Sequence, residues 1–173
     1  PPPCSNDRLF FWPNVSLVPE TPNHKAMEAL MQHATRMRTD LGVQAHFHAS
    51  ADLYRRWSPQ GHLHFGYWRW PLSPFNRKAM LDELARQVVH ELHPRQDDRL
   101  ADLGCGYGAA ARLAAREFGA RMEAITIVEE QAVEGQVAAL AAGIDDRVCM
   151  RHADFRHTGL AESSIDGAYA LES

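Results

Sequence analysis

A glycine-rich stretch at residues 102–108, Asp-Leu-Gly-Cys-Gly-Tyr-Gly, constrains the fold of this chain more than any other feature. The apolar run RLADL stands before it and predicts a strand, whereas the alanine-rich stretch AAARLAAREFG after it predicts a helix. Glycines allow the sharp turn from strand to helix and bring backbone N–H groups close to any ligand at the helix N-terminus. The stretch therefore predicts an α/β unit that has either a cofactor site or a tight turn without a ligand at this point.

The same alternation of strand and helix continues to the C-terminus. Beyond a first strand at 99–103 and a helix at 109–119, the pattern predicts strands at 122–128, 147–152 and 165–171 and a helix at 129–143. The stretch HADFRHTGLAESS predicts a loop before the last strand. Strands that alternate with helices indicate a parallel sheet with right-handed crossovers, so residues 95–173 are expected to form one α/β unit.

The first half of the chain has a different character. Residues 1–21 hold five prolines and predict an extended arm. Residues 22–94 predict a helical region, with helices at 22–40, 51–57 and 73–93. Before the last of these helices, the stretch QGHLHFGYWRWP (residues 60–71) is dense in aromatic and histidine side chains and predicts an irregular segment, here called the aromatic segment.

The composition excludes several classes of partner. The 173 residues carry 18 basic and 22 acidic side chains, a formal net charge of −4, and no basic run, so nucleic acid is not expected. No apolar stretch approaches the roughly 18–20 residues of a membrane span, and the N-terminus lacks the features of a signal peptide. Three widely spaced cysteines without a CxxC pair predict neither a disulfide framework nor a cysteine zinc site, and they favour a cytoplasmic location.

Two His-x-His pairs, His46/His48 and His62/His64, suggest a metal site, because residues two apart share a face of an extended segment. Neither pair has a cysteine or an acidic motif beside it. Ordinary pocket or surface histidines are therefore favoured, and no metal is expected.

The glycine-rich stretch fits two cofactor classes when only its residues are considered. GCGYGA matches the dinucleotide fingerprint, and Glu129 and Glu130 lie about twenty residues on, where that fingerprint has an acid for the ribose. Asp102 favours a different cofactor, because dehydrogenases usually keep an apolar residue at this position. An acid two residues before the first glycine can hold the cationic amino end of S-adenosylmethionine. A nicotinamide-dependent oxidoreductase remains the alternative.

Asp-Leu-Gly-Cys-Gly-Tyr-Gly resembles motif I of the class I S-adenosylmethionine-dependent methyltransferases. Three further stretches, LYRRWSPQGHLHFGYW, ITIVEEQ and HADFRHTGLAESSIDGAYALES, resemble the branch that contains sterol and tocopherol C-methyltransferases and cyclopropane fatty acid synthases. The resemblance implies a Rossmann-like sheet preceded by a helical lid region. It also implies methyl transfer from S-adenosylmethionine, with S-adenosylhomocysteine as product, to a small apolar or amphipathic acceptor (an isoprenoid, a sterol-like molecule, a lipid or a polyketide-like natural product). Cyclopropane synthase-like methylene transfer is the alternative on the same fold.

The resemblance also implies roles for individual residues. The methionine part of the cofactor would lie at Asp102, Gly104, Cys105 and Gly106. Its ribose would lie at Thr126 and Gln131, and its adenine at Asp154 and Phe155. Gln131 has the alternative of an exposed helix residue, and Asp154 that of a loop cap. His64 and Tyr67 in the aromatic segment are expected to contact ligands, and His64 and Glu172 are the candidates for a general base. Glu172 could instead be an ordinary loop acid.

The resembled fold has a seven-stranded sheet, of which this chain supplies four strands. An unpaired parallel strand at the end would expose an apolar edge, so we expect the later strands to be missing. A longer protein, a second copy of the chain or another chain would then complete the sheet. The acceptor, the atom that is methylated and the oligomeric state are not predicted by the sequence.

Overall fold

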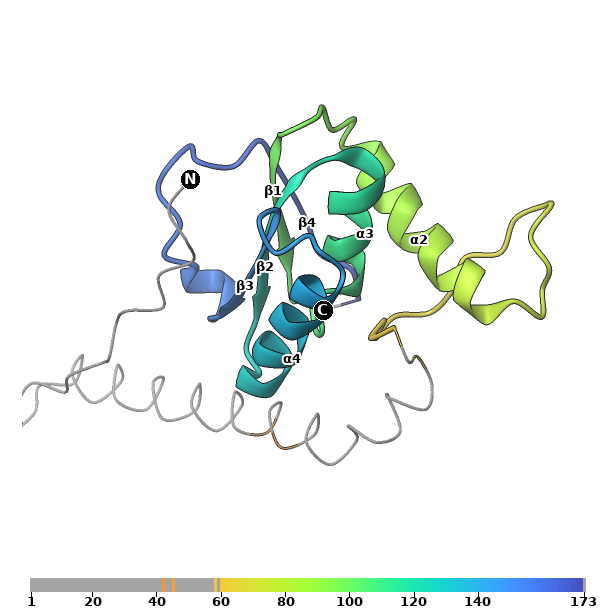
Figure 1. Cartoon of the computed structure of the whole chain (residues 1–173), viewed down its shortest axis with the longest axis horizontal. Helices are drawn as coiled ribbons and strands as arrows, with labels where there is room; N and C mark the ends of the chain where they lie inside the picture. The colour runs from red at the N-terminus through yellow and green to blue at the C-terminus, as the bar shows by residue number, and fades with distance from the viewer. Residues whose placement is uncertain (1–41, 43–44, 46–57, 59, 173) are drawn as a thin grey trace, which may run out of the picture. The chain divides into compact units, whose positions relative to one another are not determined.

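The computed structural model describes residues 42, 45, 58 and 60–172 (Figure 1). The chain divides into two compact units, residues 1–46 and 47–173, and everything described below belongs to the second. The arm predicted at 1–21, the helices predicted at 22–40 and 51–57 and the pair His46/His48 lie outside the described residues. The predicted division into residues 1–21, 22–94 and 95–173 stays a prediction.

Four parallel strands form one sheet in the order β3-β2-β1-β4, which confirms the predicted α/β fold (Figure 1). The strands are β1 (Arg99–Leu103), β2 (Arg121–Thr126), β3 (Val148–His152) and β4 (Gly167–Tyr169). β4 is shorter than the predicted strand at 165–171, because it pairs with β1 only along Leu100 to Asp102.

Helix α2 (Arg77–Glu91) begins later than the predicted start at Ser73 and Pro74. The side chain of Asn76 accepts a hydrogen bond from the Ala79 N–H at 3.0 Å and caps the first turn. Ser73 instead belongs to a turn, in which its carbonyl accepts from the Asn76 N–H at 3.0 Å. The sequence reasoning placed the start at the proline and overlooked the stronger cap that follows it.

Helices α3 (Ala109–Phe118) and α4 (Glu129–Ala141) follow β1 and β2, close to the predicted ranges. α3 ends at Gly119 and α4 shortly before Gly143, and both glycines have a left-handed φ (68° and 66°). The predicted loop after β3 contains one turn of 3-10 helix, η1 (Phe155–His157), that the sequence reasoning did not predict.

The core lies between the sheet and the helices that follow β1 and β2. α3 and α4 both pack against β2 and β3, and α2 packs against α3 (Figure 1). The inner side of α3 is nearly all alanine, so the helix approaches the sheet closely, and its fully buried residues include Ala111 and Ala114. Gly135 has the same effect in α4, because a Cβ there would lie 2.5 Å from the Met150 methyl carbon. This packing fixes the carboxyl ends of β1 and β2, where open α/β sheets bind their ligands.

In the described part of the chain, no helix has both the length and the apolar character needed to cross a membrane.

Candidate functional site

The glycine-rich turn between β1 and α3 is built from residues with left-handed backbone. Gly104, Gly106 and Gly108 have φ values of 82°, 55° and 69°, which residues with a Cβ rarely adopt. The turn is held against β2, because the N–H groups of Gly104 and Cys105 both donate to the Ile125 carbonyl at 2.9 Å. Gly108 stands at the N-cap of α3 and has no side chain, so the N-cap position itself makes no capping hydrogen bond.

Asp102 is the last residue but one of β1, shortly before the glycine-rich turn, and only 2 % of its surface is exposed. Its Oδ2 atom is buried and has no hydrogen-bond partner in the described part of the chain, and neither has the hydroxyl of Tyr169, the residue paired with it on β4. Burial raises the pKa of the Asp102 carboxyl to about 7, against smaller opposing effects of the Tyr169 hydroxyl and the Ala111 N–H. An unpaired buried carboxylate oxygen is costly, so the site favours a cationic or donor group beside it.

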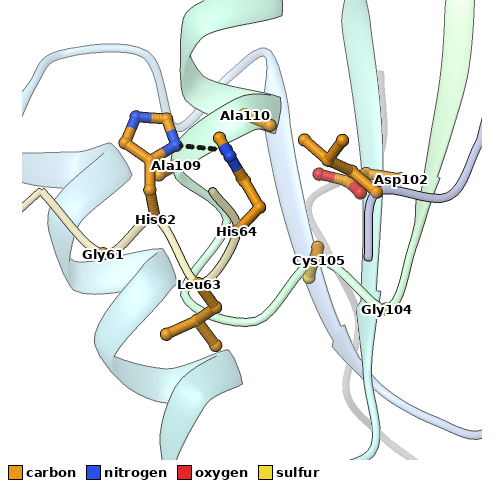
Figure 2. Close-up of a pocket in the computed structure, with 10 residues that line it drawn as sticks. Gly61, His62, Leu63, His64, Asp102, Gly104, Cys105, Ala109 and Ala110 are labelled. Atoms are coloured by element: carbon orange, nitrogen blue, oxygen red, sulfur yellow. Dashed lines mark hydrogen bonds between the residues drawn. The ribbon is translucent and has the colours of Figure 1, made fainter. Parts of the chain in front are cut away.

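A small pocket joins Asp102 to the glycine-rich turn and the aromatic segment (Figure 2). Its lining comes from the aromatic segment, the end of β1, the turn, the start of α3 and the residues after β4: Gly61, His62, Leu63, His64, Asp102, Gly104, Cys105, Ala109, Ala110 and Leu171. The pocket thus brings together four of the predicted site residues, namely His64, Asp102, Gly104 and Cys105. Gly106, the third member of the turn, lies directly beneath Leu63.

The aromatic segment packs directly on the glycine-rich turn. A Cβ on Gly106 would lie 2.6 Å from the Leu63 Cδ1 atom, so only glycine lets the two backbones approach this closely. The Arg112 guanidinium of α3 joins the two parts, because it donates to the Tyr107 carbonyl at 2.5 Å and to the Gln60 carbonyl at 2.8 Å. The first half of the segment therefore forms one wall of the pocket.

The second half of the segment is anchored on α2 and leaves its rings exposed. The Tyr67 N–H donates to the Met80 carbonyl at 2.8 Å, and Arg69 forms an ion pair with the buried Glu83 at 2.6 Å. Tyr67 is 47 % exposed and does not line the pocket, so its predicted ligand contact stays a prediction. Trp68 and Trp70 are also exposed.

His62 and His64 are nearly buried and hydrogen-bonded to each other, with 2.9 Å between His62 Nδ1 and His64 Nε2 (Figure 2). The other nitrogen of His62 lies 2.9 Å from an Asp82 carboxylate oxygen, and the other nitrogen of His64 lies 2.6 Å from the Phe65 carbonyl. Both nitrogens of each ring thus contact protein groups. Burial lowers the pKa of His64, and His62 lowers it further. The ring of His64 faces the pocket, but no nitrogen of it is left to take a proton from a substrate in this arrangement.

Glu172 lies beyond β4, next to the pocket residue Leu171, and its side chain is exposed. Its two carboxylate oxygens accept from the Phe65 N–H at 3.2 and 3.1 Å. The structure therefore places Glu172 beside the aromatic segment, at the mouth of the pocket, with lone pairs left for a substrate proton.

Thr126 and Gln131, the predicted ribose pair, are brought together between the end of β2 and the start of α4. The Thr126 hydroxyl donates to Gln131 Oε1 at 2.8 Å, and both residues are buried. The alternative of an exposed helix residue is wrong for Gln131, which is 3 % exposed. Glu129 and Glu130, the acids of the oxidoreductase alternative, lie in the exposed first turn of α4.

Asp154 and Phe155, the predicted adenine residues, lie at η1 and do not line the pocket. The Asp154 side chain caps this turn by accepting from the Arg156 N–H at 2.8 Å, and it also pairs with the Arg156 guanidinium. The capping role that the sequence reasoning kept as the alternative is therefore present. Phe155 is 45 % exposed.

Cys105 is a free thiol whose pKa burial raises well above its usual range, which does not favour a nucleophile. Within residues 60–172, no group of three or more His, Cys, Asp and Glu side chains could hold a metal ion.

The sequence reasoning missed several residues around the pocket. Asp82 and Lys78 lie four apart on α2 and form an ion pair, and the Asp82 carboxylate also reaches His62. Tyr169 faces Asp102 across the β1–β4 pairing, which only the sheet order reveals. The i, i+4 spacing of the charged pair was the one signal available in the sequence.

Comparison with known proteins places this geometry in a family. The family model described as mycolic acid cyclopropane synthetase matches residues 34–166. The O-methyltransferase resE of Aspergillus sclerotiorum is 31% identical over 113 residues, which are 65% of this chain and 43% of that protein. A probable fatty acid methyltransferase of Pseudomonas putida is 32% identical over 123 residues, which are 69% of this chain and 30% of that protein. The chain thus spans less than half the length of these relatives.

A solved structure shows the same fold. The geranyl diphosphate C-methyltransferase of Streptomyces coelicolor A3(2), in complex with Mg2+, geranyl diphosphate and S-adenosyl-L-homocysteine, aligns with a TM-score of 0.58 at 23% identity. The alignment covers 68% of this chain and 48% of that one. Because the family model spans more than half of the sequence and the strand order agrees, the chain belongs to the mycolic acid cyclopropane synthetase family of class I S-adenosylmethionine-dependent methyltransferases.

Proposed function

We propose that the protein binds S-adenosylmethionine at the glycine-rich turn and transfers its methyl group to a small apolar or amphipathic acceptor. The single observation that carries this proposal is the buried Asp102 carboxylate, whose Oδ2 atom lacks a partner beside the N-terminus of α3 in the described part of the chain. A cationic amino group would pair with this carboxylate, and a carboxylate would suit the positive end of the helix. The methionine end of the cofactor carries both groups.

The other cofactor contacts follow from the same placement. Gly104, Cys105 and Gly106 would lie against the methionine part, because Gly104 and Cys105 line the pocket and Gly106 belongs to the same turn. Thr126 and Gln131 would face the ribose from the end of β2, beyond the glycine-rich turn. For Asp154 and Phe155, the exposed Phe155 ring supports an adenine contact, whereas the Asp154 carboxylate also caps η1.

When bound, the cofactor supplies an electrophilic methyl group on a sulfonium, which is transferred by in-line displacement. Residues 61–64 of the aromatic segment cover the glycine-rich turn, so the segment would exclude water from this reaction. Glu172 is the proposed acceptor of the proton that the acceptor molecule loses, because its carboxylate is accessible at the mouth of the pocket. His64 is proposed to act through its position, since both of its ring nitrogens are engaged.

The acceptor class is supported by relatives and by the surface of the segment. The named relatives act on a fatty acid in one case and on geranyl diphosphate in another, which are both molecules with long apolar parts. In the aromatic segment, whose residues 61–64 line the pocket, this chain exposes aromatic rings of matching character at Phe65, Trp68 and Trp70. Cyclopropane formation is the second candidate, because the matching family model carries that name.

Equilibrium binding tests the cofactor assignment. Isothermal titration of the chain with S-adenosylhomocysteine and with NAD should show binding of the first and none of the second, and the reverse preference would refute the proposal. Gly104→Val and Asp154→Ala are expected to weaken binding about tenfold or more, which is ~1.4 kcal/mol. Val137→Ala, on an exposed face of α4, is the matched control.

A deuterated cofactor separates the two reactions in the whole protein. With S-adenosylmethionine that carries a CD3 group, methyl transfer leaves three deuterium atoms in the product, whereas cyclopropane formation leaves two. Mass spectrometry of products from fatty acid, isoprenoid and polyketide acceptors reads this difference directly. A product with two deuterium atoms and no remaining double bond would replace the first candidate by the second.

In the described sheet, β4 pairs with β1 only, at one edge. We keep the proposal that further strands, from the same protein, a second copy or another chain, extend the sheet beyond β4.

A further inference from the structure

The hydrogen bonds of His62 and His64 determine how many protons the two rings can carry. Each imidazole has two nitrogens, so the pair has four positions, and all four have partners. The outer nitrogen of His64 faces the Phe65 carbonyl, which can only accept, so that nitrogen must carry a hydrogen. The outer nitrogen of His62 faces the Asp82 carboxylate, which when ionised can also only accept.

The inner contact then requires one more proton. His62 Nδ1 and His64 Nε2 lie 2.9 Å apart, and a hydrogen bond at this distance needs one hydrogen between the two nitrogens. Two neutral rings have two hydrogens in all, and both would be used by the outer partners. The inner nitrogens would then face each other with lone pairs. Three hydrogens satisfy every contact, and a fourth would place two N–H groups against each other.

The charges around the pair agree with one extra proton. On α2, burial opposes ionisation of Asp82, but the hydrogen bonds from His62 and Lys78 outweigh it and lower the pKa to about 2, so Asp82 is an anion at neutral pH. Burial, the largest effect, lowers the pKa of His64, and His62 lowers it too, whereas the Phe65 carbonyl, Glu172 after β4 and Asp82 favour its charged form. From β1 and the turn, the pocket adds Asp102 and Cys105, which carry no positive charge. Lys78 is the cation next to the cluster, and it pairs with Asp82.

We propose that His62 and His64 share one proton as a singly charged pair, and that this pair, held by Asp82, positions the Phe65 amide against Glu172 at the mouth of the pocket. A continuous line of hydrogen bonds connects Lys78 and Asp82 on α2, the two histidines, the backbone of Phe65 and the Glu172 carboxylate. The Phe65 carbonyl accepts from His64, and the Phe65 N–H donates to Glu172. The proton count stands on geometry alone, whereas its relevance to methyl transfer rests on the proposed function.

Nitrogen chemical shifts of the rings test the proton count. In the chain labelled with 15N-histidine at pH 7, three of the four ring nitrogens of His62 and His64 should be protonated, with the signals assigned by His62→Asn and His64→Asn. Asp82→Asn should reduce the number to two, because the new amide can donate to His62 Nε2 and so satisfies a neutral pair. Lys78→Met leaves the carboxylate in place and should keep three. Two protonated nitrogens in the unmodified chain, or no change in Asp82→Asn, would overturn the proposal.

Hydrogen exchange tests the positioning role. The Phe65 amide should be protected in the unmodified chain, and His62→Ala should speed its exchange about tenfold or more, which is ~1.4 kcal/mol of lost protection. His93→Ala removes an exposed histidine whose ring bonds the Glu91 carbonyl and contacts His90, and it should leave the Phe65 amide unchanged. If His62→Ala does not fold, Asp82→Asn provides the second readout, since it should keep protection while changing the proton count. Unchanged protection in folded His62→Ala would refute the positioning role.

Cofactor binding distinguishes this proposal from the proposed function. If three ring nitrogens are protonated but the chain does not bind S-adenosylhomocysteine, the proposed function is refuted and the shared proton stands. If the chain binds S-adenosylhomocysteine but only two ring nitrogens are protonated, the shared proton is refuted and the proposed function stands. In the whole protein, Asp82→Asn should shift the pH profile of kcat/KM, because the charge near Glu172 changes, whereas Lys78→Met should shift it less.

Discussion

The buried carboxylate of Asp102 should make the chain without ligand lose stability as the pH rises. Its pKa is about 7 in the folded chain and 3.8 for an ordinary aspartate. Between these two values the folded state binds a proton that the unfolded state has released, so the free energy of unfolding falls as the pH rises. One pH unit corresponds to ~1.4 kcal/mol, and the shift as a whole corresponds to about 4 kcal/mol. The full stability is present below pH 3.8 and is lost as the pH passes 7.

Urea unfolding at several pH values between 5 and 8, followed by circular dichroism, measures this effect against Asp102→Asn. Asparagine has the same shape and does not titrate, so the difference between the two proteins cancels the contributions of histidines and surface groups. The difference should change by about 2 kcal/mol between pH 5 and 7. S-adenosylhomocysteine should reduce this slope, because its amino group stabilises the charged carboxylate. Parallel stability profiles of the two proteins would refute the reasoning.

Two further substitutions test the contact between the aromatic segment and the glycine-rich turn. Gly106→Ala should destabilise the chain by more than Gly143→Ala, because both residues have a left-handed φ but only Gly106 has Leu63 within 2.6 Å of the new Cβ. The backbone strain shared by the two is roughly 1–2 kcal/mol, so equal losses of stability in urea unfolding would contradict the proposed close contact. Arg112→Met should raise hydrogen exchange across the first half of the segment, since it removes the donors to the Gln60 and Tyr107 carbonyls. The exposed Arg116→Met should leave that exchange unchanged, and an equal effect of both would count against the Arg112 contacts.

The α/β fold could be predicted from the sequence because its signals are local. The glycines at 104, 106 and 108 stand between a strand pattern and a helix pattern, and the chain can make that turn only with left-handed residues. The alternation of strands and helices after it predicts a parallel sheet, which the structure confirms, whereas the order β3-β2-β1-β4 was not predicted. The start of α2 was missed because proline and asparagine both signal helix starts, and only the hydrogen bond from the Ala79 N–H decides between them.

The site could be predicted only in part, because burial and pairing depend on distant parts of the chain. Asp102 was a candidate from its place before the first glycine. Its neighbour in the sheet, Tyr169, lies 67 residues further along the chain, so the sequence alone did not show that the Asp102 Oδ2 atom would be buried without a partner. Likewise, His62 was one of a pair two residues apart, and nothing local indicated that Asp82 on α2 would bind it. Nothing in the sequence showed that both nitrogens of His64 would be engaged.

The end of β2 holds both halves of the proposed cofactor site. The Ile125 carbonyl accepts from the N–H groups of Gly104 and Cys105, and the very next residue, Thr126, donates to Gln131. A displacement of this strand end would therefore move the glycine-rich turn and the Thr126–Gln131 pair together. Substitutions that shift Ile125 are expected to change both sets of contacts at once rather than either alone.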